Sequence, residues 1–231
     1  MPDPTLVLDG RSLRIADVVR VARNPGAPVA LDPAARERLG QSRRAIEAAI
    51  AEGRTMYGVN TGFGKLANVR IPPDKLDRLQ ANLIRSHAAG VGDPLPADVV
   101  RGLMLLRANV LLRPTSGVRP ALVDALLAML NARLLPLVPE QGSVGASGDL
   151  APLSHVALAL MGEGELIETG ATAGRRVPAG PALAAAGLAP FRFAPKEGLA
   201  FINGTQAQTA LLRCSSMTRR CSGAPRRARP R

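Results

Sequence analysis

The sequence predicts a mainly α fold with a few short strands. Of the 231 residues, 46% are hydrophobic but only 2% are aromatic. The core must therefore be built from Ala, Leu, Val and Ile, the usual filling between packed helices. In the middle of the chain apolar residues recur at every third or fourth position, and Gly or Pro closes each such run. The length suits one sizeable domain or two small ones.

Two helices and a short hairpin are expected between the N-terminus and Gly53. Residues 6–13 (LVLDGRSL) resemble a hairpin that turns at its Asp-Gly pair, because this pair tolerates positive φ. Residues 14–23 have helical spacing. The next helix is expected to begin near Asp32, since Asp can cap a helix and the Pro after it suits the first turn. We expect it to end at Gly53.

The same reasoning extends to the rest of the body. Asp149 is a candidate N-terminal cap for one of the later helices. The segment 165–180 has β-like pieces separated by turn residues. Helical spacing is found in residues 74–90, 97–113, 120–135, 150–162 and 196–212.

A change of composition after Leu212 predicts a boundary. Seven Arg and no acidic residue follow it, so most of the formal net charge of +12 belongs to residues 213–231. We expect 1–212 to be the folded part and 213–231 an aberrant, basic, disordered tail. The 27 Arg against 3 Lys indicate a GC-rich gene, read out of frame after Leu212. The rival interpretation is a non-catalytic fragment whose tail binds nucleic acid, but this tail has no aromatic residue for stacking on bases.

Composition also excludes several classes of site. Both cysteines lie in the tail, so the body can form neither a disulfide framework nor a cysteine metal site. No apolar stretch approaches the ~20 residues that span a bilayer. The N-terminus lacks a basic region followed by an apolar one. These observations predict a cytoplasmic protein without membrane or metal.

Two familiar catalytic patterns fail on spacing. Residues 58–65 (GVNTGFGK) lack the first Gly of a phosphate-binding loop and the Ser or Thr that should follow its Lys, so no nucleotide site is expected. Ser147, Asp149 and His155 could form a nucleophilic triad, but His155 follows on the next helix instead of lying far away in sequence. We expect His155 to be structural.

Glycine and small residues crowd the stretch GSVGASGDLAPLSH (Gly142–His155). If the chain bends tightly there, the amide nitrogen of Gly148 can reach the carbonyl carbon of Ala146, because Gly has no β carbon in the way. Loss of one water from that adduct and of the Ser147 hydroxyl as a second water would leave a five-membered ring with an exocyclic methylene. Such a group is an electrophile that no ordinary side chain provides.

This stretch resembles the signature of the histidine and aromatic amino-acid ammonia-lyases, in which Ala-Ser-Gly becomes 4-methylidene-imidazole-5-one (MIO). The resemblance implies an N-terminal MIO-bearing domain and the start of a long-helix bundle, through which full-length members form homotetramers. It covers about residues 5–212, roughly the first half of a family member. Four more blocks resemble the family in the same order: YGVNTGFG (Tyr57–Gly64), NLIRSHAAGVG (Asn82–Gly92), LLRPTSGVRP (Leu111–Pro120) and KEGLAFINGTQA (Lys196–Ala207).

The resemblance also implies roles for individual residues. Ala146, Ser147 and Gly148 would form the MIO, with Asp149 assisting the cyclisation. Tyr57 matches the base that removes the β proton of the substrate. Asn203 matches a residue near the MIO and the substrate amine.

The pair Ser86-His87 is similar to the histidine-specific members, in which the His contacts the substrate imidazole. The implied reaction is elimination of ammonia from L-histidine to give trans-urocanate. A tyrosine or phenylalanine ammonia-lyase, or an aminomutase with the same ring, stays open as an alternative. Because the family's second half supplies further substrate-binding residues, we expect this truncated chain to be inactive.

Overall fold

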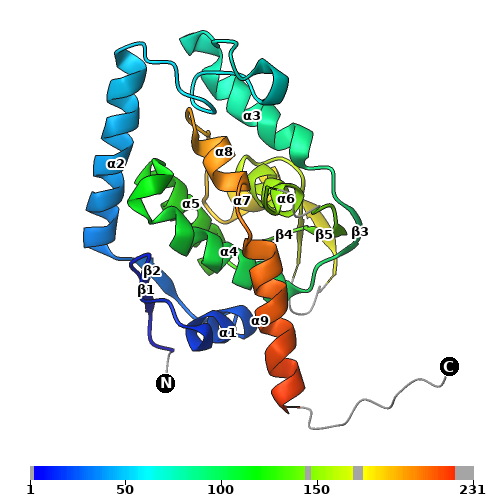
Figure 1. Cartoon of the computed structure of the whole chain (residues 1–231). Coiled ribbons are helices and arrows are strands. Elements are labelled where there is room, and N and C mark those ends of the chain that lie inside the picture. The colour runs from blue at the N-terminus through cyan, green and yellow to red at the C-terminus, as the bar shows by residue number, and fades with distance from the viewer. Residues whose placement is uncertain (1–2, 144–146, 169–173, 222–231) are drawn as a thin grey trace, which may run out of the picture.

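The computed structural model describes residues 3–143, 147–168 and 174–221. Helices dominate it, and short strands lie at the margins of the helical body (Figure 1). The helices are α1 (Ile15–Arg23), α2 (Pro33–Ala51), α3 (Leu76–His87), α4 (Ala97–Leu111), α5 (Pro120–Asn131), α6 (Leu150–Leu160), α7 (Ala179–Ala185), α8 (Glu197–Ile202) and α9 (Gln206–Cys221). The strands are β1 (Leu6–Leu8), β2 (Val29–Leu31), β3 (Val91–Pro94), β4 (Leu135–Pro136), β5 (Pro139–Gln141), β6 (Glu165–Ile167) and β7 (Arg176–Pro178). The prediction of a mainly α fold is confirmed.

Helix α4 is the centre of the core. It packs against α1, α5 and α9, and its buried residues cover most of its circumference, from Val99 to Leu111. Gly102 faces both neighbours, since a β carbon there would be in ordinary contact with Ala210 of α9, at 3.6 Å, and with Ala22 of α1, at 3.8 Å. A second group of helices, α3, α6 and α8, packs together and is joined to the first through α4 and α8 (Figure 1).

The expected hairpin at residues 6–13 is wrong. Strand β1 instead pairs in parallel with β2, with Leu6 opposite Val29 and Leu8 opposite Leu31. The turn itself is present: the Asp9 carboxylate accepts hydrogen bonds from the amides of Arg11 and Ser12, at 2.7 and 2.8 Å. These bonds direct the chain into α1, which serves as the crossover between the two parallel strands.

The other strands form two small antiparallel sheets. Strand β3 pairs with β5, and β4, β6 and β7 form a three-stranded sheet in the order β4-β6-β7. The β-like pieces expected within 165–180 correspond to β6 and β7. Helix α5 ends at Asn131, earlier than expected, because Arg133 takes a positive φ of 60° and the chain enters β4.

The expected start and end of the second helix are confirmed. The carboxylate of Asp32 accepts a hydrogen bond from the amide of Ala35 at 2.7 Å. This bond satisfies one of the exposed donors at the start of α2. Gly53 follows the last turn with φ +73°. Glycine adopts that conformation without steric cost.

The segment 196–212, expected as one helical run, is divided into α8 and α9 at Asn203-Gly204. Helix α9 then continues to Cys221, so the expected change to a disordered tail at Leu212 is wrong for residues 213–221. Those residues contain neither Pro nor Gly, and nothing in them stops a helix that has already begun. The remainder of the expected tail, 222–231, lies outside the described residues.

Candidate functional site

Gly148 lies directly against Gly204, the glycine of the α8–α9 turn. Its φ is +115°, and a β carbon on it would come within 2.6 Å of the Gly204 carbonyl oxygen. Only glycine fits this position, because any side chain would overlap backbone. Ser147 is exposed beside it, whereas Ala146 lies outside the described residues.

Asp149 fixes this contact. Its amide donates to the carbonyl oxygen of Gly204 at 2.6 Å. Its fully buried carboxylate accepts from the Ser143 hydroxyl at 2.9 Å and from Gln208, through the backbone amide at 3.0 Å and the side-chain amide at 2.8 Å. The expected cap is therefore wrong: Asp149 precedes α6, but its side chain makes no capping bond and is bound instead to the first turn of α9.

Tyr57 lies in the loop after α2, with 61% of its surface exposed. The loop is held from within by Asn60, whose side chain accepts from the Met56 amide and donates to the Arg54 carbonyl, both at 2.7 Å. Gly58, at φ +71°, packs so closely on α8 that a β carbon would overlap Leu199. The Tyr57 ring makes an edge contact with Phe63, at 6.3 Å between centroids.

Tyr57 and Asn203 line one cavity of about 290 Å³. It lies between the Tyr57 loop, α4 and the end of α8. The charged residues that line this cavity are all cationic: Arg107, Arg113 and Lys196. Burial lowers the pKa of Lys196, and the nearby positive charge of Arg43 lowers it further. The cavity thus combines a phenol, a carboxamide and positive charge, which suits an anionic ligand.

Ser86 and His87 close the last turn of α3. The Ser86 hydroxyl donates to the Leu83 carbonyl at 2.9 Å, and His87 Nδ1 lies 2.8 Å from the same oxygen. His87 Nδ1 also lies 3.1 Å from the Ser86 hydroxyl oxygen, so two neighbouring groups hold this edge of the ring. Neither residue lines the Tyr57 cavity.

His155 has a structural contact, as expected. Its Nε2 accepts a hydrogen bond from the Gly90 amide at 3.1 Å, which ties α6 to the segment after α3. Burial lowers the pKa of His155 below its ordinary value, which favours the neutral imidazole.

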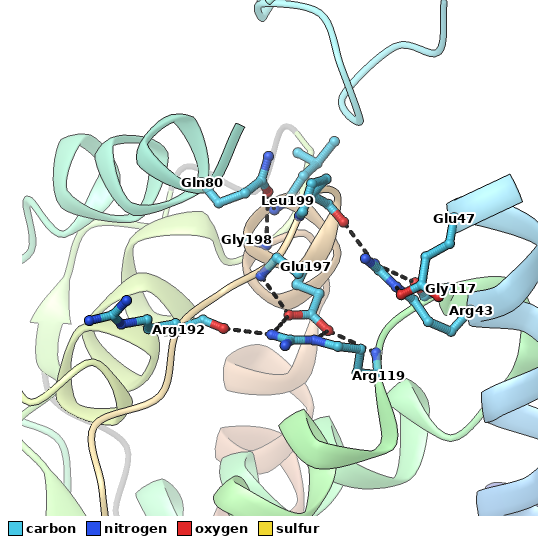
Figure 2. A network of polar contacts seen from close by, with 11 residues as sticks. Arg43, Glu47, Gln80, Gly117, Arg119, Arg192, Glu197, Gly198 and Leu199 are labelled. Atoms are coloured by element: carbon cyan, nitrogen blue, oxygen red, sulfur yellow. Dashed lines mark hydrogen bonds and ion pairs between the residues drawn. The ribbon is translucent and has the colours of Figure 1, made fainter. Parts of the chain in front are cut away.

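The N-terminal end of α8 is held by a buried polar network, shown in Figure 2. The fully buried Glu197 accepts from the Arg119 guanidinium at 2.7 and 2.9 Å and from the Arg119 backbone amide at 2.8 Å. This hydrogen bonding raises the pKa of Arg119. Gln80 of α3 accepts from the amides of Gly198 and Leu199, so two exposed donors of α8 are satisfied by a side chain from another helix.

Sequence reasoning missed several of these supporting residues. Gln80, Arg107, Arg119 and Glu197 all lie within helical runs or near their ends, where polar side chains are normally solvated. The only signal in the sequence was their position inside or beside the family-like blocks, and such blocks do not separate site residues from their supports. Among the residues that the structure describes, no group of three or more His, Cys, Asp or Glu could hold a metal.

Comparison with known proteins agrees with this arrangement. A sequence profile described as "Aromatic amino acid lyase" matches residues 13–219. The chain belongs to the aromatic amino acid lyase family. The matched region ends at residue 219, so the family resemblance extends seven residues beyond the expected end at Leu212.

Individual lyase relatives are similar over most of this chain. Histidine ammonia-lyase of Geobacillus thermodenitrificans is 55% identical over 89% of this chain, and that of Anaeromyxobacter sp. (strain K) is 56% identical over 90%. The matched parts are 40% and 41% of those proteins. The chain therefore spans about two fifths of the length of the curated relatives that it matches.

Solved structures of the family share the fold. The crystal structure of histidine ammonia-lyase from Trypanosoma cruzi has a TM-score of 0.85 and 39% identity, covering 94% of this chain and 41% of that one. A tyrosine aminomutase from Streptomyces globisporus has a TM-score of 0.83 and 37% identity, covering 91% and 38%. In the described part of the chain, no helix has the length and apolar character needed to span a membrane.

Proposed function

We propose that this chain is the N-terminal part of a histidine ammonia-lyase, which eliminates ammonia from L-histidine to give trans-urocanate. The observation that carries the proposal is the close contact between Gly148 and Gly204. Asn203, the residue before Gly204, lines the same positively charged cavity as Tyr57. The names of the two bacterial relatives, which are 55% and 56% identical to this chain, support histidine as the substrate.

The residues present fit the MIO group. The cyclisation that forms it requires a bent chain and an amide nitrogen without a neighbouring β carbon. Gly148 meets both needs at φ +115°. The next residue, Asp149, is held in place by three hydrogen bonds that its carboxylate accepts and one that its backbone amide donates. We infer that Ala146, Ser147 and Gly148 form the ring, which supplies an electrophilic methylene to the reaction.

The side chains of this chain would handle the substrate. Tyr57 is the proposed base for the β proton, and its exposed ring at the cavity makes the phenol accessible. Asn203 would hydrogen-bond the substrate amine. The positive lining of the cavity favours the carboxylate of an amino acid. His87 would hydrogen-bond the substrate imidazole, and the Ser86 hydroxyl, 3.1 Å from His87 Nδ1, would help to hold the His87 ring.

We propose that the full-length protein is a cytoplasmic homotetramer. The exposed apolar side chains of Leu211 and Leu212 on α9 support an association surface there.

The activity can be tested in a chimera. Residues 13–212 of this chain would replace the matching segment of the Geobacillus thermodenitrificans enzyme, which supplies the length that this chain does not span. We expect release of urocanate from L-histidine, and loss of at least about 10²-fold in kcat for Tyr57→Phe, as for removal of a general base. Turnover of L-tyrosine in preference to L-histidine would overturn the proposed substrate, and formation of a β-amino acid would indicate an aminomutase.

The ring can be tested without turnover. Mass spectrometry of the peptide that contains residues 146–148 should show the loss of two waters, and Ser147→Ala should abolish that loss. An unmodified peptide from an active chimera would overturn the proposed cofactor.

A further inference from the structure

Arg107 is a buried cation without an acidic partner in the described part of the chain. It lies on α4 and is 2% exposed. Burial alone lowers its pKa to about 10. An unpaired charge is costly to bury, so its hydrogen bonds should have a specific use.

The guanidinium joins α8 to α9. It donates to the carbonyl oxygen of Ala200, to the carbonyl oxygen of Asn203 at 3.2 Å, and to the side-chain oxygen of Gln206 at 2.6 Å. The two carbonyls belong to the C-terminal end of α8, whose partial negative charge a cation stabilises. The Phe201 ring centroid lies 5.9 Å from the guanidinium carbon. This cation–π contact restricts the guanidinium further. The planar fork therefore replaces the backbone hydrogen bonds that are lost where the helix breaks.

Gly204 is enclosed between this guanidinium and Gly148. A β carbon on Gly204 would overlap Arg107 Nη1. On its other contact surface, the Gly204 carbonyl oxygen accepts the Asp149 amide and meets Gly148. A displacement of Arg107 would therefore be transmitted to Gly148 through a single residue.

We propose that Arg107 is a positioning residue of the lyase site, which fixes the Asn203-Gly204 turn and thereby sets where Gly148 and Asn203 lie. The role in a lyase site rests on the proposed function, but the effect of Arg107 on the position of the Asn203-Gly204 turn can be measured separately. Two Arg107 nitrogens, Nη1 and Nη2, donate three hydrogen bonds to three acceptors in the fixed plane of the guanidinium, so a lysine, with its single ammonium nitrogen, should not replace it.

Arg101 provides a matched control on the same helix. It is also 2% exposed, and it donates to the carbonyl oxygens of Val21, Asn24 and Leu130 at 3.0, 3.3 and 3.4 Å. Substitution of Arg101 should cost comparable stability without touching the Asn203-Gly204 turn.

The test is amide hydrogen exchange of this chain under native conditions, comparing Arg107→Lys and Arg107→Met with Arg101→Lys and Arg101→Met. We expect the Asp149 amide to exchange at least about tenfold faster in both Arg107 variants, beyond any change in the amides of α5, and to keep its protection in the Arg101 variants. Arg107→Lys, which keeps the charge, serves if Arg107→Met does not fold.

Equal exchange of Asp149 in Arg107→Lys and Arg101→Lys would overturn the proposal, as would a wild-type Asp149 amide without protection. Neither result depends on ring formation or turnover. A failure of the proposed lyase activity is therefore distinguishable from a failure of the positioning role.

Discussion

The amide of Asp149 donates to the carbonyl oxygen of Gly204 at 2.6 Å, which joins the start of α6 to the turn between α8 and α9. These two residues are far apart in sequence, yet both belong to the family-like blocks. The close approach leaves Gly148 no room for a β carbon beside the Gly204 backbone, and the side chains of Arg107 and Gln206 leave Gly204 no room for one either.

Gly148→Ala should destabilise the fold. The added methyl would meet the Gly204 backbone at 2.6 Å. It would also sit at a φ that alanine adopts poorly. We expect a loss of about 1–3 kcal/mol in the free energy of unfolding, measured with urea. Gly40→Ala is the control, since a β carbon there lies 3.6 Å from its nearest neighbour on α2. That substitution should be neutral or stabilising. Equal midpoints for wild type and Gly148→Ala would contradict the close contact.

Asp149→Asn should also be costly. The carboxylate accepts from three donors, and an amide group would bring its own donor against one of them. A loss of about 1–3 kcal/mol is expected in urea unfolding, together with less of the two-water loss in the peptide with residues 146–148. Asp32→Asn is a suitable comparison, because Asn caps helices about as well as Asp. If both substitutions cost the same small amount, Asp149 has no special role.

Glu197→Gln tests the network below α8. Removing the buried charge leaves Arg119 without its bidentate partner. Breaking such a pair costs about 3 kcal/mol. The exposed pair of Arg36 and Asp124 offers the matched change Asp124→Asn. For that change we expect less than about 1 kcal/mol. Thermal unfolding of both variants would measure the difference. A Glu197→Gln protein as stable as Asp124→Asn would argue against the importance of the network.

His155 predicts a pH dependence of stability. Burial lowers its pKa in the folded chain below the value of 6.5 in the unfolded chain. The folded state therefore binds fewer protons. The contribution of neutral His155 to the free energy of unfolding is complete above pH 6.5, and it is lost as the pH falls below that value towards the folded pKa. His155→Gln, whose amide oxygen can still accept from Gly90, should flatten the urea midpoint between pH 7.5 and 5.5. An equally steep fall in the variant would assign the effect to other groups.

The sequence predicted local features better than their partners. Asp32 and Asp149 both precede an apolar helical run, and both were expected to cap it. Asp32 does so through the amide of Ala35. Asp149 does not, because its carboxylate instead accepts hydrogen bonds from Ser143 and Gln208, which lie outside that helix. A cap is a local property, whereas these partners are known only from the tertiary fold.

The same limit explains the first strand. The Asp9 turn was recognised, but the partner of β1 is β2, beyond α1, and not the residues just after the turn. Buried cations such as Arg107 were equally hidden, since helical spacing assigns Arg to the solvent face. Tyr57, Asn203 and Gly148 were found through the resemblance, and their proximity became visible only in the structure.

Helix α8 is held at its base by residues that precede it by much of the chain. The Gln80 side chain accepts from the amides of Gly198 and Leu199, which follow it by 118 and 119 residues. The Arg43 guanidinium donates to the carbonyl oxygen of Pro195, 152 residues later in the sequence. Contacts of such long range form late, because the loop between the partners must first be closed. During synthesis the earlier helices leave the ribosome before α8 does. The Tyr57 loop can therefore acquire its final packing only after Leu199, against which Gly58 lies, has emerged.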